Sequence, residues 1–109
     1  MLVFINTFTV DLANQQRLVD LLCTVTDLYV RRAAGFLSST LHRSLDGTKV
    51  TMYAQWASME AYEAMRRDPR PLPYLQQALA IARFEPASYE VVRSFSPTRP
   101  ERPQDGPQK

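Results

Sequence analysis

Residues 35–56 read GFLSSTLHRSLDGTKVTMYAQW, and this stretch predicts a β-hairpin. Asp46-Gly47 favours a tight turn because glycine tolerates positive φ, and strand-forming residues flank the pair on both sides. Side chains alternate along a strand, so residues 50, 52, 54 and 56 share an apolar face that ends in Trp56, the only tryptophan of the chain. The opposite face, which carries Tyr53, is amphipathic. We therefore expect helices against the first face and either water or a second subunit against the other.

The pattern around the hairpin predicts a β-α-β-β-α-β order. The expected elements are a strand at 2–10, a helix from about 14 to near 35, the two hairpin strands, a short helix capped by Ser58 that reaches Met65, a helix at 74–82 and a strand at 88–95. This order is typical of an α+β, ferredoxin-like fold, in which an antiparallel sheet carries its helices on one face.

The same pattern predicts one domain and a homodimer. Residues 1–95 would form the domain, and residues 96–109, which are rich in proline, would form a disordered tail. With Tyr53 on the uncovered face of the sheet, burial against a second copy is the expected way to remove that face from water.

Composition and charge limit the kinds of molecule that the protein is expected to bind. The 109-residue chain is 45% hydrophobic and has a formal net charge of +2, so one compact domain without a basic stripe is expected, and neither nucleic acid nor a membrane surface is predicted as a partner. The N-terminal region lacks the features of a signal peptide or a membrane span, which makes the cytoplasm the expected location. Cys23 lies among apolar residues and is expected to be a buried thiol.

Motifs for cofactors are not found in the sequence. With one cysteine, one histidine and no carboxylates at ligand spacing, no metal site is predicted. The glycines are isolated, so no phosphate-binding loop can be drawn. His42 has no nucleophile context and is expected at a surface or interface. The sequence therefore predicts no cofactor.

A set of aromatic, hydroxyl and amide groups remains as the candidate site, around a cavity between sheet and helices. Its members are Asn6, Met52, Trp56, Tyr62 and Tyr74. Such groups suit a flat aromatic ligand, although Trp56 and Met52 are also ordinary core residues and Tyr62 could simply pack on its helix with its hydroxyl in water. The residues alone predict a small α+β domain with an internal pocket.

Several short segments carry a resemblance to a known family. They are GFLS at 35–38, LH at 41–42, DGT at 46–48, YAQW at 53–56 and EAY at 60–62. Over about residues 3–95 the chain resembles the antibiotic biosynthesis monooxygenase family, in particular the small anthrone monooxygenases of aromatic polyketide pathways. The resemblance implies a dimeric α/β barrel built from ferredoxin-like subunits. It also implies oxidation of an anthrone-like polyketide to a quinone by O₂, without metal, flavin or nicotinamide.

The resemblance assigns roles to the candidate residues. Trp56 and Tyr62 match the tryptophan and tyrosine of the family pocket and are implied as catalytic, while Asn6, Met52 and Tyr74 are expected to bind substrate. Met52 departs from the pattern, which has asparagine at that position. Asn6 would supply a compensating amide if its side chain faces the helices.

One further element of the family pattern, an arginine after the D-P-R segment, has no clear match. Arg66, Arg67 and Arg70 lie nearby and are expected in solvent. Two other functions therefore stay open: a polyketide cyclase or aromatase on the same fold, and a non-catalytic protein that binds an aromatic ligand.

Overall fold

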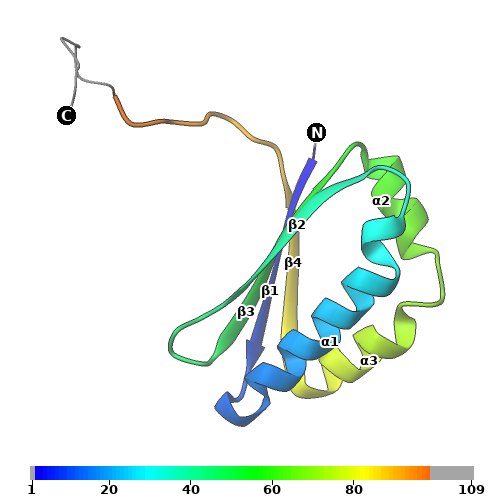
Figure 1. Ribbon diagram of the computed structural model, residues 1–109, viewed down its shortest axis with the longest axis vertical. Helices are drawn as coiled ribbons and strands as arrows, with labels where there is room; N and C mark the ends of the chain where they lie inside the picture. The colour runs from blue at the N-terminus through cyan, green and yellow to red at the C-terminus, as the bar shows by residue number, and fades with distance from the viewer. Residues whose placement is uncertain (1, 99–109) are drawn as a thin grey trace.

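The structure is a computed structural model that describes residues 2–98. Strands β1 (Leu2–Val10), β2 (Phe36–Arg43), β3 (Lys49–Trp56) and β4 (Ala82–Tyr89) form one antiparallel sheet in the order β2-β3-β1-β4. Helices α1 (Gln15–Leu28), α2 (Met59–Arg66) and α3 (Leu72–Ile81) lie on one face of this sheet (Figure 1). The expected α+β, ferredoxin-like fold is confirmed.

The helices differ a little from their expected bounds. The helix expected to reach Gly35 ends at Leu28 and is followed by a 3₁₀ turn at Val30–Arg32, and α3 begins at Leu72 rather than Tyr74. Among residues 2–98, no helix combines the length and apolar character that crossing a membrane requires.

The hairpin turn is held by its own side chains. Gly47 has φ +83°, the positive value that is expected for glycine in the Asp46-Gly47 turn. The Asp46 carboxylate accepts hydrogen bonds from Thr48 Oγ1 at 2.7 Å and from Ser44 Oγ at 2.8 Å. These bonds, that of Thr48 first, lower the pKa of Asp46 to about 2. From the start of α1, Gln15 Nε2 donates to the Ser44 carbonyl at 3.1 Å, which ties the helix to the turn.

The core between sheet and helices is divided into two clusters. One comprises Phe8, Val10, Leu18, Leu22, Val50 and Ala78, and the other comprises Phe4, Ala54 and Trp56. Along β1, Asn6 stands between Phe4 of the second cluster and Phe8 of the first. The apolar packing is thus interrupted near the middle of the sheet.

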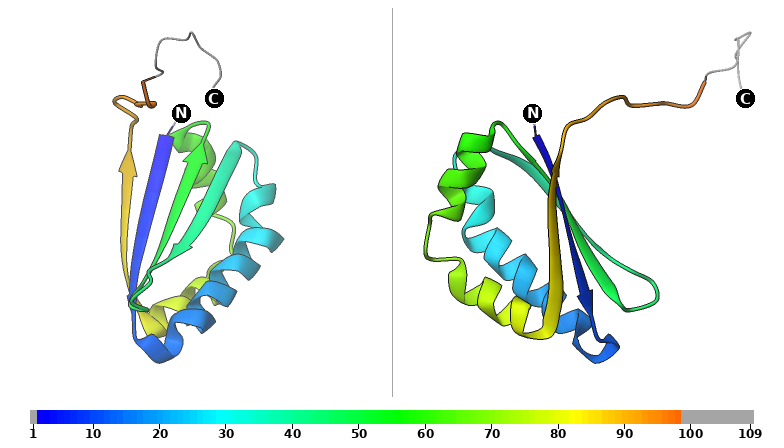
Figure 2. Two further views of the ribbon diagram at one scale, coloured as in Figure 1. Left: turned by 60° about the vertical axis from the view of Figure 1, so that its left-hand side comes forward. Right: turned by 180° about the vertical axis from the view of Figure 1, so that it is seen from behind.

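The last strand was predicted at the wrong place. It was expected at residues 88–95, but β4 occupies Ala82–Tyr89 and directly follows α3. β4 contains Pro86, which is tolerated because β4 lies at an edge of the sheet and one side of the strand needs no partner. Residues 90–98 form no helix or strand and lead away from the sheet (Figure 2). Most of the predicted tail lies outside the described residues.

Candidate functional site

A cavity of about 130 Å³ lies between the sheet and the helices, where the core is divided. Its sheet wall is formed by Phe4, Asn6 and Phe8 of β1 and by Met52, Ala54 and Trp56 of β3. These residues alternate along their strands and therefore point to the same side, as the pleat requires. Val25 and Thr26 of α1, Tyr62 of α2 and Leu75 of α3 are among the residues that close it from the helical side.

Trp56 forms one end of the cavity. Its side chain is buried, with 1% of the residue exposed, and its ring meets Phe36 edge to face at 5.4 Å between centroids. The Tyr62 ring meets it in the same manner at 5.8 Å. The indole N–H can only donate a hydrogen bond, so in this wall it suits an oxygen atom of a ligand.

Tyr62 lies beside Trp56 and is oriented by two contacts. Its ring stacks on Phe4, with centroids 3.9 Å apart and an angle of 18° between the planes. Its hydroxyl oxygen accepts a hydrogen bond of 2.8 Å from Nη1 of Arg66, one turn later on α2. Because Arg66 occupies the oxygen as a donor, the phenolic proton of Tyr62 stays available to another acceptor.

The start of α2 places Tyr62 on the helical side of the cavity. The Ser58 hydroxyl caps the helix by accepting a hydrogen bond of 3.1 Å from the amide of Ala61, as its sequence position predicted. Gly35 has φ +84°, and a Cβ added to it would collide with Ala61. Glycine at this position therefore allows α2 to pack against the chain just before β2.

Asn6 faces the helices, which is the orientation that its proposed role required. It pairs with Met52 across β1 and β3, and both side chains line the cavity. The Asn6 Oδ1 atom is buried, and no donor among residues 2–98 reaches it. A buried acceptor without a partner lowers the stability of the fold by about 1–3 kcal/mol. This cost falls on the Asn6 oxygen unless a ligand or a water molecule donates a hydrogen bond to it.

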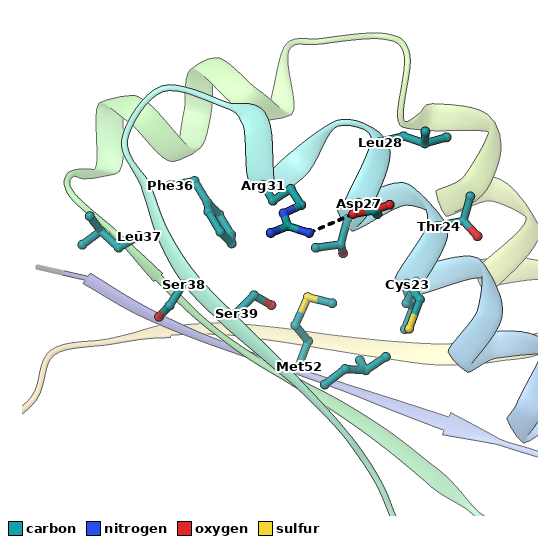
Figure 3. A pocket seen from close by; sticks show the side chains of 13 residues that line it. Cys23, Thr24, Asp27, Leu28, Arg31, Phe36, Leu37, Ser38, Ser39 and Met52 are labelled. Carbon is teal, nitrogen blue, oxygen red and sulfur yellow. Dashed lines mark hydrogen bonds and ion pairs between the residues drawn. The ribbon is translucent and has the colours of Figure 1, made fainter.

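A larger groove of about 790 Å³ adjoins the cavity and runs between α1 and β2 (Figure 3). Leu22, Thr26 and Met52 border both spaces. Cys23 lies at the groove and is exposed, so the expectation of a buried thiol was wrong. Its neighbour Leu22 faces the core, and a step of one residue turns a helix by about 100°, which carries Cys23 out of the core.

Tyr74 is the one predicted site residue that does not line the cavity. Its ring packs near that of Tyr29, with centroids 6.1 Å apart. The Arg70 guanidinium lies 5.1 Å from the Tyr29 centroid and binds Asp68 with 2.7 Å between Nη2 and Oδ2. Hydrogen bonds from Arg70 lower the pKa of Asp68, which makes this carboxylate at the cavity rim a weak base.

The structure thus brings Asn6, Met52, Trp56 and Tyr62 together around one cavity. Sequence reasoning missed Arg66, which was expected only in solvent: the side chain is exposed, yet its guanidinium reaches the Tyr62 hydroxyl. The spacing of four residues on one helix was the available signal. Within residues 2–98 there is no grouping of His, Cys, Asp and Glu side chains that could hold a metal ion.

Comparison with known proteins places this geometry in a family. Residues 1–71 match the family described as antibiotic biosynthesis monooxygenase. Tetracenomycin-F1 monooxygenase of Streptomyces glaucescens is 40% identical over 97 residues, which cover 89% of this chain and 87% of that protein.

Solved structures agree. The monooxygenase ActVA-Orf6 of Streptomyces coelicolor, in complex with Nanaomycin D, is 32% identical with a TM-score of 0.78, covering 89% of this chain and 92% of that chain. SnoaB, a cofactor-independent oxygenase from Streptomyces nogalater, shares the fold at 21% identity and a TM-score of 0.77, covering 85% of this chain and 94% of its own. The aromatic cavity between sheet and helices is therefore that of a member of the antibiotic biosynthesis monooxygenase family, to which this chain belongs.

Proposed function

We propose that this protein is a cofactor-independent monooxygenase that oxidises an anthrone-like, polycyclic aromatic polyketide intermediate to a quinone with O₂. The observation that carries the proposal is the contact of Trp56 on the sheet with Tyr62 on the helical side, edge to face at 5.8 Å, in the lining of a mainly apolar cavity. The names of the relatives, a tetracenomycin-F1 monooxygenase and a cofactor-independent oxygenase, support the same reaction class.

The substrate can supply the electrons. Loss of a proton from the CH₂ carbon between the anthrone rings gives a carbanion, which transfers one electron to O₂ and then recombines with the resulting superoxide. The peroxide anion takes up a proton; loss of the remaining C–H proton and cleavage of the O–O bond then leave the quinone carbonyl and release water. One anthrone and one O₂ thus yield one quinone and one H₂O. The protein needs to orient the rings, favour the carbanion and deliver a proton.

The cavity groups match these tasks. The Trp56 N–H would donate to a carbonyl or peroxide oxygen and so stabilise negative charge as it develops. The Tyr62 hydroxyl, whose oxygen is already occupied by Arg66, would donate its proton to the peroxide. Asn6 and Met52 would contact the substrate between these groups and the groove.

The size of the two spaces sets how such a substrate would lie. Sites for small organic ligands usually measure roughly 300–1,000 Å³, and the inner cavity alone, at about 130 Å³, is smaller than that. The groove between α1 and β2 adds about 790 Å³. A tricyclic substrate would therefore place its reacting ring beside Trp56 and extend past Met52 into the groove.

The proposal also includes a homodimer that forms through the free face of the sheet. Ile5 and Tyr53 pair across β1 and β3 on that face, and both are only partly buried in the single chain. On the extended segment that leaves β4, Val92 and Phe95 are 92% and 78% exposed in the single chain. Apolar surface of this kind favours association with a second copy. The expected cytoplasmic location stays a prediction.

Turnover of a hydroxylated anthrone tests the reaction. Purified protein is incubated with dithranol and O₂ without added cofactor, and quinone absorbance and O₂ uptake are followed. We expect Trp56→Phe and Tyr62→Phe to lower kcat by about tenfold to a hundredfold, because each removes one hydrogen bond made in the transition state. Tyr89→Phe removes a hydroxyl from an exposed tyrosine that borders neither the cavity nor the groove, so it is the matched control and should leave kcat unchanged.

The outcomes separate the candidate functions. Oxidation no faster than the spontaneous background contradicts the oxygenase proposal and favours a cyclase or a binding protein. Cofactor-free turnover that neither substitution slows would show that the reaction is right and the site residues are wrong.

A further inference from the structure

We propose that the Asn6 carboxamide oxygen is the specificity determinant of the cavity and accepts a hydrogen bond from a phenolic hydroxyl on the aromatic ligand. The inference rests on the proposed class of ligand and adds which substituent the cavity selects. It is carried by an observation that the oxygenase reaction does not use: Asn6 Oδ1 is buried without a partner among the described residues.

The surroundings of Asn6 are aromatic and apolar. On one side along β1, Phe4 stacks on Tyr62 at 3.9 Å, and on the other side Phe8 stacks on Phe84 at 4.6 Å. The residues opposite Asn6 on the neighbouring strands are Met52 and Pro86. None of these flanking side chains on the sheet carries a donor for Oδ1, and the gap between the two stacks is where the core divides.

The chemistry of the ligand follows from the missing donor. A carboxamide oxygen is an acceptor, so the ligand group that completes it must carry a proton on an electronegative atom. A ring carbonyl, an ether or a bare C–H edge cannot do this, whereas a phenolic hydroxyl can. A site that hydrogen-bonds a substrate hydroxyl also rejects an analogue that lacks it, because the acceptor is then left buried and unpaired. The geometry thus selects hydroxylated rings over unsubstituted rings.

The test uses ligands that cannot turn over. 2,6-Dihydroxyanthraquinone and anthraquinone have the same rings and are already oxidised, and the hydroxyls at positions 2 and 6 are too far from the ring carbonyls to bond to them. Binding of either compound can be followed by quenching of the fluorescence of Trp56, the only tryptophan. Wild type should bind the dihydroxy compound about tenfold more tightly, the effect of one hydrogen bond. Asn6→Leu, which fills the gap with an apolar side chain, should abolish that preference and raise the thermal midpoint. Asn6→Asp, which keeps an acceptor, should preserve the preference.

Thr7→Val is the matched control, because Thr7 is the next polar residue on β1 and points to the opposite face of the sheet. It should leave the preference unchanged. Equal binding of both ligands by wild type, or an unchanged preference in Asn6→Leu, overturns the inference and assigns the Asn6 oxygen to water. A retained preference together with no cofactor-free oxidation of dithranol would reject the oxygenase proposal and keep the role of Asn6.

Discussion

At the scale of single residues, the exposed Arg66 guanidinium contacts the Tyr62 hydroxyl at the cavity. The phenol ring is held by its stack on Phe4, but the direction of its proton depends on which lone pair Arg66 occupies. In the proposed reaction Arg66, which also borders the cavity, would therefore be a positioning residue that acts through the phenol.

Substitution of Arg66 tests this link. Arg66→Ala should lower kcat for dithranol by about fivefold with little change in KM, since a hydrogen bond of ~1 kcal/mol is lost and the ligand contact is not. Arg66→Lys should restore part of the rate. In the Tyr62→Phe background, Arg66→Ala should have no further effect, which a double-mutant cycle measures.

Arg67→Ala provides the comparison, because Arg67 is the adjacent exposed arginine at the end of the same helix. A rate as low in Arg67→Ala as in Arg66→Ala would indicate a general effect of positive charge. Additive losses in the Tyr62→Phe background would show that Arg66 acts independently of the phenol.

At the scale of elements, the groove between α1 and β2 extends the space that is open to a ligand beyond the inner cavity. The hairpin and the start of α1 are tied together through Gln15, while farther along the helix the groove lies open between Cys23 and the residues around Ser38 (Figure 3). Met52 stands where groove and cavity meet. Its flexible thioether suits a wall that ligands of different shape must pass.

Thiol labelling reports on occupancy of this groove. Cys23 is the only cysteine and is exposed, so native protein should release one equivalent of thiolate from Ellman's reagent. Saturating 2,6-dihydroxyanthraquinone should slow this release several-fold because its outer ring would cover the groove. Phenol, which fits within the inner cavity, should leave the rate unchanged. Equal labelling rates with and without the tricyclic ligand would place the ligand elsewhere.

At the scale of the whole molecule, helices cover one face of the sheet, and no helix or strand of residues 2–98 covers the other (Figure 1). The free face carries an apolar centre around Ile5 and Tyr53, and the segment after β4 leaves the domain with Val92 almost fully exposed. In the single chain Ile5 and Tyr53 are only partly buried. Their burial in a dimer would give both features a role.

The association constant measures that role. Val92→Glu should raise the dimer dissociation constant at least about tenfold, because it forces a carboxylate into an apolar contact. It should leave the stability of the single chain unchanged, since the residue touches little there. Leu45→Glu, at a fully exposed residue of the hairpin turn, is the control and should not alter association. Sedimentation velocity over a range of concentrations distinguishes the two, and a wild-type protein that sediments as a monomer contradicts the dimer.

Much of the architecture was readable from local pattern. The bounds of β1, the hairpin around Gly47, the cap at Ser58 and the faces of β1 and β3 follow from alternation, helical spacing and turn chemistry, which act over a few residues. β4 was misplaced because alternation alone favoured residues 88–95, whereas pairing with β1, which is distant in sequence, selects Ala82–Tyr89.

The candidate site, too, was predictable from the sequence only in part. Alternation was enough to put Met52 and Trp56 on one face of β3, and the resemblance singled out Tyr62. That Asn6 of β1 shares this face was decided by the pairing of β1 with β3. The bond from Arg66, the separation of Tyr74 from the cavity, the exposure of Cys23 and the unpaired oxygen of Asn6 required the packed chain. The physical reason is range: periodicity sets the side of an element on which a group lies, whereas a cavity and an unsatisfied hydrogen bond exist only between elements that are distant in sequence.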